Sequence, residues 1–196
     1  MNKGSYENSA LECSAVMKPL LEPTNLYCRS MVFSEPCLVP EEMGLYAWYC
    51  KEIPGITPTD GCVVKDDRTL LYVGRTGNLR ERVRYTFEGN AEGSTFRKSL
   101  GVLLAEKSGF PLRRVGSGKR MAFTHLGESW LNDWMEQNAF VCWMTHSEPR
   151  KVKQCIINSV SLPLNIQNNR HHRFYNTLSK MRQEAERMAI QMPIVE

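Results

Sequence analysis

The sequence predicts an α+β protein with a small mixed or antiparallel sheet flanked by helices. Two short segments rich in aromatic and β-branched residues, 44–50 (GLYAWYC) and 70–74 (LLYVG), have the composition of strands, and a connection rich in proline, glycine and aspartate joins them. Apolar residues then recur at helical spacing, as in residues 94–106. With 196 residues, 42% of them hydrophobic, the chain is long enough to bury one substantial core.

The other elements follow from periodicity, composition and capping residues. Ser94 or Thr95 is a suitable helix cap, and Pro149 is suited to the first turn of a helix. Helices are predicted at 78–87, 94–106, 128–137, 149–160 and 173–188. Further strands are predicted at 120–126 and 139–145, so the sheet should contain at least four short strands.

We interpret the chain as a domain with two extensions. Residues 1–40 contain four prolines and no sustained period, which favours an N-terminal arm or irregular extension. Residues 41–170 form the domain, and residues 171–196 a C-terminal helix packed on it.

No apolar run is long enough to span a bilayer, and residues 1–10 are polar. Seven cysteines, odd in number and never spaced as CxxC, indicate neither a disulfide framework nor a zinc site. We therefore expect a reduced, cytoplasmic protein that does not engage a membrane.

Basic residues are concentrated in one part of the chain. Residues 75–120 contain eleven Arg and Lys against four Glu, a local charge of +7 within an overall charge of +4. Such a cluster suits a polyanion, because each neutralised phosphate releases counterions. A solvated basic surface would have the same composition, so charge alone leaves both interpretations open.

Two tyrosines near the ends of the predicted strands, and an arginine in the helix that follows, have the chemistry for a phosphate site. Tyr46 and Tyr72 could place two phenols on one side of the sheet, although tyrosines in strands are commonly core residues. A phenol acts as a base only beside a cation, since its reference pKa is about 10. Arg82 could hold two phosphate oxygens with its planar fork, or be solvated.

These residues belong to a longer pattern. It consists of Gly44-Leu45-Tyr46, Tyr72-Val73-Gly74-Arg75, Asn78-Leu79-Arg80-Glu81-Arg82, Lys153-Gln154-Cys155-Ile156-Ile157 and Pro163-Leu164-Asn165. The pattern resembles the GIY-YIG nuclease family, in which GIY, YIG, N-L-x-x-R, a helix with E-x-x-L-I and a P-x-N turn follow in this order. The wide spacing between the two tyrosines is similar to that of restriction-type members.

The resemblance implies a GIY-YIG-like fold, hydrolysis of phosphodiester bonds and roles for individual residues. Tyr46 and Tyr72 would be the paired active-site tyrosines, with Tyr46 as general base. Arg75 would touch the scissile phosphate and Arg82 would be the essential arginine. Asn165 would help hold the site together.

The resemblance also implies a surface for nucleic acid. Residues 94–100 are similar to a stretch of restriction-type members, which makes Arg97 and Lys98 candidate contacts to the DNA backbone. Arg80 and Arg84 would join them. Thr86 stands where many relatives have His or Tyr, and the neighbouring Tyr85 is expected to reach the same space.

The main departure from the family is Lys153, which stands where the family has its metal-binding glutamate. The family uses Mg²⁺ or Mn²⁺, but an ammonium group has no lone pair for a metal ion. The catalytic set is therefore expected to include Lys153 and no metal ligand. Glu148, five residues earlier, points elsewhere on an ideal helix and is a poor substitute.

Three hypotheses follow. The first is a GIY-YIG DNA endonuclease of the restriction type that is inactive or impaired because of Lys153. The second is a natural, catalytically dead nucleic-acid-binding module. The third is a protein-interaction domain whose basic patch binds an acidic partner. DNA is the expected substrate, RNA stays open, and the oligomeric state is not predicted.

Overall fold

The computed structural model describes residues 14–195, so the polar residues 1–10 lie outside the described part. Its centre is a four-stranded antiparallel sheet in the order β2-β3-β1-β6. The central strand β1 (Gly44–Cys50) pairs with β3 (Arg68–Thr76) and with β6 (Ala139–Thr145). The short β2 (Val64–Lys65) lies beside β3. The predicted α+β class is thereby confirmed.

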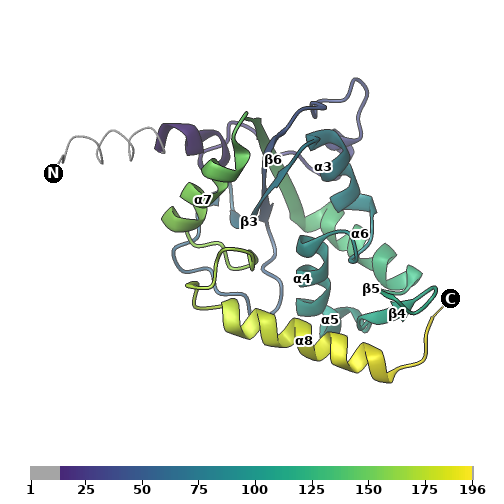
Figure 1. Cartoon of the computed structure of the whole chain (residues 1–196). Coiled ribbons are helices and arrows are strands. Elements are labelled where there is room, and N and C mark those ends of the chain that lie inside the picture. The colour runs from purple at the N-terminus through teal and green to yellow at the C-terminus, as the bar shows by residue number, and fades with distance from the viewer. Residues whose placement is uncertain (1–13, 196) are drawn as a thin grey trace.

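Helices cover both faces of this sheet (Figure 1). Tyr46 and Trp48 of β1 belong to a core cluster with residues of α3 (Leu79–Glu88), α4 (Thr95–Leu103), α6 (His125–Asn138) and α8 (Tyr175–Gln191). On the other side, Leu45, Ala47 and Tyr49 pack with α7 (Pro149–Ser159) and helical residues 14–21. All seven residues of β1 are consequently buried. This two-sided burial explains why the strand lacks the apolar–polar alternation of a sheet exposed on one face.

Four of the helices begin at residues suited to a helix start. The side chains of Asn78, Ser94 and Thr124 accept hydrogen bonds from the first turns of α3, α4 and α6, and Pro149 opens α7. The helices are α2 (Arg29–Val32), α3 (Leu79–Glu88), α4 (Thr95–Leu103), α5 (Ala105–Ser108), α6 (His125–Asn138), α7 (Pro149–Ser159) and α8 (Tyr175–Gln191).

The prediction of a strand at 120–126 in the main sheet is wrong, both in the length of the strand and in the sheet to which it belongs. Only β5 (Arg120–Ala122) is extended, and it pairs with β4 (Arg113–Val115) in a separate two-stranded hairpin. The chain turns into α6 already at His125, because Thr124 caps that helix. The helix predicted at 94–106 is also divided into α4 and α5. The fourth strand of the main sheet is β2 instead.

The first described residues pack against the sheet. Met17 and Leu20 are buried, and the Tyr49 hydroxyl donates a 2.7 Å hydrogen bond to the Leu20 carbonyl. Tyr27 forms an isolated bridge with Val141 of β6. The described part of the N-terminal extension therefore covers β1 and β6.

Helix α8 runs along the side of the domain that carries α4 and the hairpin (Figure 1). Beyond its end, Val195 pairs with Val115, and Arg113 and Arg114 donate hydrogen bonds to the carbonyls of Pro193 and Met192. These two arginines of β4 hold the C-terminal segment against the hairpin through hydrogen bonds.

Two further observations concern the compartment. No helix in residues 14–195 has the length and apolar character to cross a membrane. Within the same range Cys28, Cys37, Cys50, Cys62 and Cys142 are free thiols, whereas Cys155 is disulfide-bonded. The expectation of a chain without disulfides is therefore corrected at Cys155.

Candidate active site

The two tyrosines of the pattern come from neighbouring strands and face the same side of the sheet. Tyr46 lies opposite Gly74, and Trp48, two residues further along β1, lies opposite Tyr72. Residues two apart in a strand share a face, so Tyr46 and Tyr72 form a diagonal pair. Their ring centroids are 6.4 Å apart, and they are only 5% and 9% exposed. The strand register thus brings the two phenols together.

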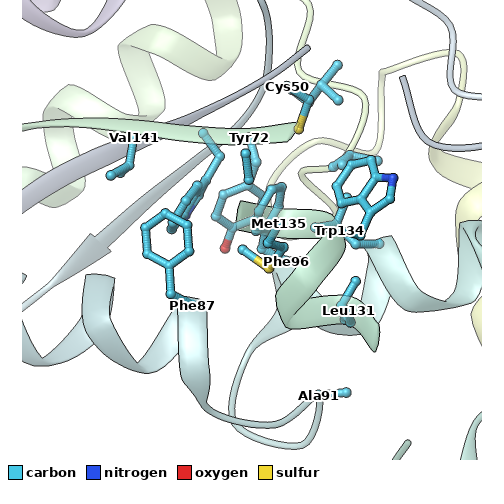
Figure 2. Close-up of a cluster of buried hydrophobic side chains, with 14 of the residues drawn as sticks. Cys50, Tyr72, Phe87, Ala91, Phe96, Leu131, Trp134, Met135 and Val141 are labelled. Atoms are coloured by element: carbon cyan, nitrogen blue, oxygen red, sulfur yellow. The ribbon is translucent and has the colours of Figure 1, made fainter. Parts of the chain in front are cut away.

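Tyr72 is held in place by the core on this side. Its ring lies 5.3 Å from that of Phe96, which itself stacks on Trp48 at 5.1 Å. Figure 2 shows Tyr72 among these side chains, with Phe96, Phe87 and Met135 nearby. The position of the phenol is therefore set by aromatic packing.

Two glycines of the pattern allow close approaches. A Cβ on Gly74 would lie 2.1 Å from Cζ of Tyr46, so this ring occupies the space that a side chain would fill. A Cβ on Gly44 would lie 2.1 Å from the carbonyl oxygen of Met144 and 2.9 Å from Leu79. Gly74 therefore makes room for the ring of Tyr46, and Gly44 allows β6 and α3 to approach β1 closely.

Arg82 projects from α3 and is oriented by the loop that follows this helix. Its Nη1 donates a 2.9 Å hydrogen bond to the carbonyl of Gly93. Tyr85, one turn on, packs on Gly93 and Gly89 and donates a 3.1 Å hydrogen bond to Asn90. The loop at 89–94 is therefore shaped around Tyr85, and it fixes Arg82 in turn.

The predicted residues line one cavity of about 250 Å³. Its walls are Tyr46, Tyr72, Arg75, Arg82, Gly93, Ser94, Thr95, Lys153 and Gln167. Three cationic side chains and two phenols thus converge on a space that no carboxylate of residues 14–195 lines. This composition suits an anion.

Asn165 lies behind the cavity rather than in its wall. It is buried, and its side chain pairs with the backbone of Val73 in both directions: the Val73 N–H donates to Oδ1 and Nδ2 donates to the Val73 carbonyl, each at 2.8 Å. Val73 stands between Tyr72 and Gly74. Asn165 consequently fixes the strand that carries both residues, and we describe it as a positioning residue.

Electrostatics keep the phenols protonated. Burial raises the pKa of Tyr46 far above its usual range; Tyr72 adds to the rise, and Arg82 opposes it. The pKa of Tyr72 is also raised by burial, against the effect of Arg82 and Arg182. At neutral pH both groups are therefore hydrogen-bond donors, and Tyr46 cannot serve as a base unless a bound group lowers its pKa.

Lys153 extends from α7 to the same place. Its Nζ lies 5.9 Å from the centre of the Tyr72 ring. Burial, and secondly the charge of Arg75, lower its pKa to about 8. In residues 14–195 no carboxylate forms an ion pair with it. The ammonium is thus a buried charge that faces the cavity without a counterion.

The residues of this cavity do not fit a divalent metal ion. A hard cation needs oxygen ligands, preferably carboxylates, and here it would meet Lys153, Arg75 and Arg82. No group of three His, Cys, Asp or Glu in the described part of the chain could hold a metal. Glu148 is exposed and pairs with Lys151, so it does not replace the missing ligand.

The predicted DNA-backbone contact by Arg97 is wrong. Its side chain is fully buried and bonds to the Glu128 carboxylate at 2.6 Å and to the carbonyls of Thr86 and Phe87 at 3.1 and 2.9 Å. The last two carbonyls belong to the final turn of α3, where helical carbonyls lack intrahelical partners. Arg97 therefore joins α3, α4 and α6.

The other basic candidates are paired on the surface. Arg80 pairs with Glu41, Arg84 with Glu35 and Lys98 with Glu186. Tyr85 is 38% exposed and lines a hollow next to the cavity. The charge of residues 75–120 is thus largely engaged within the protein, while Arg75 and Arg82 face the cavity.

One cation near the site escaped the sequence interpretation. Arg182 of α8 is partly buried, and its charge acts on the Tyr72 phenol. Arg182 lies one helical turn after the buried Leu178, so helical periodicity puts the two residues on the same side of α8. The periodicity does not show which other element Arg182 contacts.

A compact, cationic cavity beside two phenols has the chemistry to hold an anionic group such as a phosphate ester. Residues 44–184 match the family model of the GIY-YIG catalytic domain. This match covers most of the chain, and the chain belongs to the GIY-YIG family. No curated protein and no solved structure is significantly similar to it. The domain indicates a nuclease, and hence a nucleic-acid substrate, in general.

Proposed function

We propose that the chain is a GIY-YIG-type DNA endonuclease framework of the restriction type whose hydrolytic step is lost or impaired, because Lys153 occupies the position of the metal ligand. The observation that carries this proposal is the cavity itself. It gathers Tyr46, Tyr72, Arg75 and Arg82 around the Lys153 ammonium, without any carboxylate in the wall. Nucleic acid would bind there through a backbone phosphate.

The chain's own residues would bind this phosphate in complementary ways. The Gly93 carbonyl engages only Nη1 of Arg82, so the remaining N–H groups of the guanidinium are available to phosphate oxygens. The protonated phenols of Tyr46 and Tyr72 would donate further hydrogen bonds. Lys153 would gain the counterion that the folded protein lacks. These interactions stabilise the bound substrate, and binding of this kind does not by itself lower the barrier to hydrolysis.

The decisive experiment restores the carboxylate. Lys153→Glu is expected to bind Mn²⁺ in a calorimetric titration and to cut DNA with Mg²⁺ or Mn²⁺, whereas the unaltered chain should bind DNA and cut it slowly or not at all. Lys151→Glu is the matched control, since it makes the same charge change on the exposed side of α7. Adding Tyr46→Phe to the first variant should remove its activity.

The missing carboxylate also favours a second candidate, a natural nucleic-acid-binding module without turnover. A Lys153→Glu variant that folds and still binds DNA, but cuts neither DNA nor RNA and binds no Mn²⁺, would support this module over the impaired enzyme. DNA binding that does not change with salt would contradict both and favour a protein-interaction domain.

A further inference from the structure

The candidate active site lies between two further hollows of the surface. A hollow at α3 shares Arg82 and Gly93 with the cavity, and a hollow of about 470 Å³ at α8 shares Thr95 and Gln167 with it. The three spaces are therefore neighbours, in an order that runs from α3 past the tyrosines to α8. A strand bound with one phosphate at Arg82 has a path toward α8.

Arg182 is the cation of the α8 hollow. It is partly buried, and its one hydrogen bond among the described residues is a long one of 3.5 Å from Nη1 to the Ser99 hydroxyl. Its neighbour on the helix, Glu186, forms its ion pair with Lys98 at 3.6 Å. Most donors of this guanidinium are consequently unused, although burying a charge without good partners is unfavourable.

Arg182 also lies within electrostatic reach of the active site. Burial lowers its pKa, while Glu186 and Tyr72 oppose this effect. The Tyr72 phenol in turn responds to both Arg82 and Arg182. Two guanidinium groups from different helices, α3 and α8, therefore act on the same phenol, as expected if both face the same bound strand.

We infer that Arg182 binds the backbone phosphate next to the one held by Arg82, on the same nucleic-acid strand. This inference rests on the proposed function. The hollow also suits the rest of a nucleotide, because Ile166 and Tyr175 in its wall offer apolar and aromatic surface to a sugar or a base. Helix α8 is then part of the substrate-binding surface in addition to covering the core.

The test measures binding of a short fluorescent DNA duplex by anisotropy over about 50 to 200 mM salt. Arg182→Met is expected to weaken binding and to reduce the slope of log Kd against log salt by about one. Lys180→Met, which removes an exposed charge from the same helix, should leave both unchanged. Arg182→Lys keeps the charge and should retain the slope.

A chemical substitution locates the contact. Methylphosphonates are placed one position at a time, so that each duplex carries a single neutral phosphate. The position beside the Arg82 phosphate should weaken binding by the unaltered protein and have no further effect on Arg182→Met. A purely structural role for Arg182 would not produce this dependence on one phosphate. If Arg182→Met does not fold, the neutral but polar Arg182→Gln is compared on the same series and should lose sensitivity at that position.

The experiments distinguish a failure of this inference from a failure of the proposed function. If Arg82→Met weakens binding while a folded Arg182→Met binds with unchanged affinity and slope, the inference is wrong and the proposed function stands. If the unaltered protein shows no salt-dependent binding to DNA, both are wrong.

Discussion

The ring of Tyr46 lies directly over the Cα of Gly74 on the neighbouring strand. The two residues face each other in the β1–β3 register, and a Cβ at position 74 would stand 2.1 Å from Cζ and 2.3 Å from the hydroxyl oxygen of Tyr46. The second glycine of the GIY-YIG pattern and its first tyrosine are therefore a single steric unit.

Gly74→Ala should displace Tyr46 and disturb the site. We expect a loss of about 1–3 kcal/mol in the free energy of unfolding, typical of overpacking in a core, and weaker DNA binding. Urea denaturation and anisotropy measure the two effects. Gly77→Ala is the control, because a Cβ at Gly77 would meet no atom within 4 Å. In a Tyr46→Ala background, Gly74→Ala should lose most of its effect; an undiminished effect would contradict the steric explanation.

Arg97→Ala should unfold the protein more readily rather than weaken a surface contact. The change leaves the Glu128 carboxylate, only 13% exposed, without its partner, and removes two hydrogen bonds to the end of α3. Breaking a buried pair in this way costs about 3–5 kcal/mol. Lys98→Ala breaks a more exposed pair at 3.6 Å and should cost less than about 1 kcal/mol.

Urea denaturation of the two variants tests this contrast. Equal stability of both variants, with DNA binding lost only in Arg97→Ala, would restore Arg97 as a backbone contact.

Asn165→Ala should loosen β3 behind the tyrosines. It leaves the buried N–H and carbonyl of Val73 without the partners that Asn165 supplies, which costs about 1–3 kcal/mol. DNA binding should weaken as well, because Tyr72 and Gly74 flank Val73. Asn158→Ala, which removes an exposed amide from α7, serves as the control in urea denaturation and anisotropy. A stable Asn165→Ala with normal binding would contradict the positioning role.

The sequence predicted the part of the site that lies on β1 and β3. Two adjacent strands with a tyrosine in each led to the expectation that Tyr46 and Tyr72 share one side of the sheet, and the β1–β3 register brings them there. The loop residue Asn165 was found only through the family pattern, since nothing local indicates that its amide reaches Val73, 92 positions away.

Contacts between distant helices could not be predicted in the same way. Arg97 has the composition of a surface residue, and its burial depends on Glu128, which lies 31 positions away on α6. Arg182 likewise is a charged residue whose partners its helical spacing does not show, and only the packing of α8 on α4 brings it to Ser99. In both cases the position of a charge depends on tertiary packing that periodicity does not encode.

The pKa of Lys153 predicts how stability depends on pH. This pKa is about 8 in the folded protein, below its ordinary value of 10.5, because burial disfavours the ammonium. Between these two values the unfolded chain holds a proton that the folded chain has released. The free energy of unfolding therefore rises with pH in this window, and the penalty for the buried charge is present in full below about 8.

Lys153→Met removes this titration while keeping a long, apolar side chain. The variant should be more stable than the unaltered protein at neutral pH, and the difference should shrink as the pH rises from about 8 toward 10.5. Urea denaturation at a series of pH values measures it, with Lys151→Met as the control for an exposed lysine of α7. A difference that stays constant over this window would mean that Lys153 keeps its ordinary pKa, and that the ammonium is better solvated or paired than its place beside Tyr72 and Arg75 indicates. A shrinking difference would instead support a buried cation that lacks a counterion until a phosphate binds.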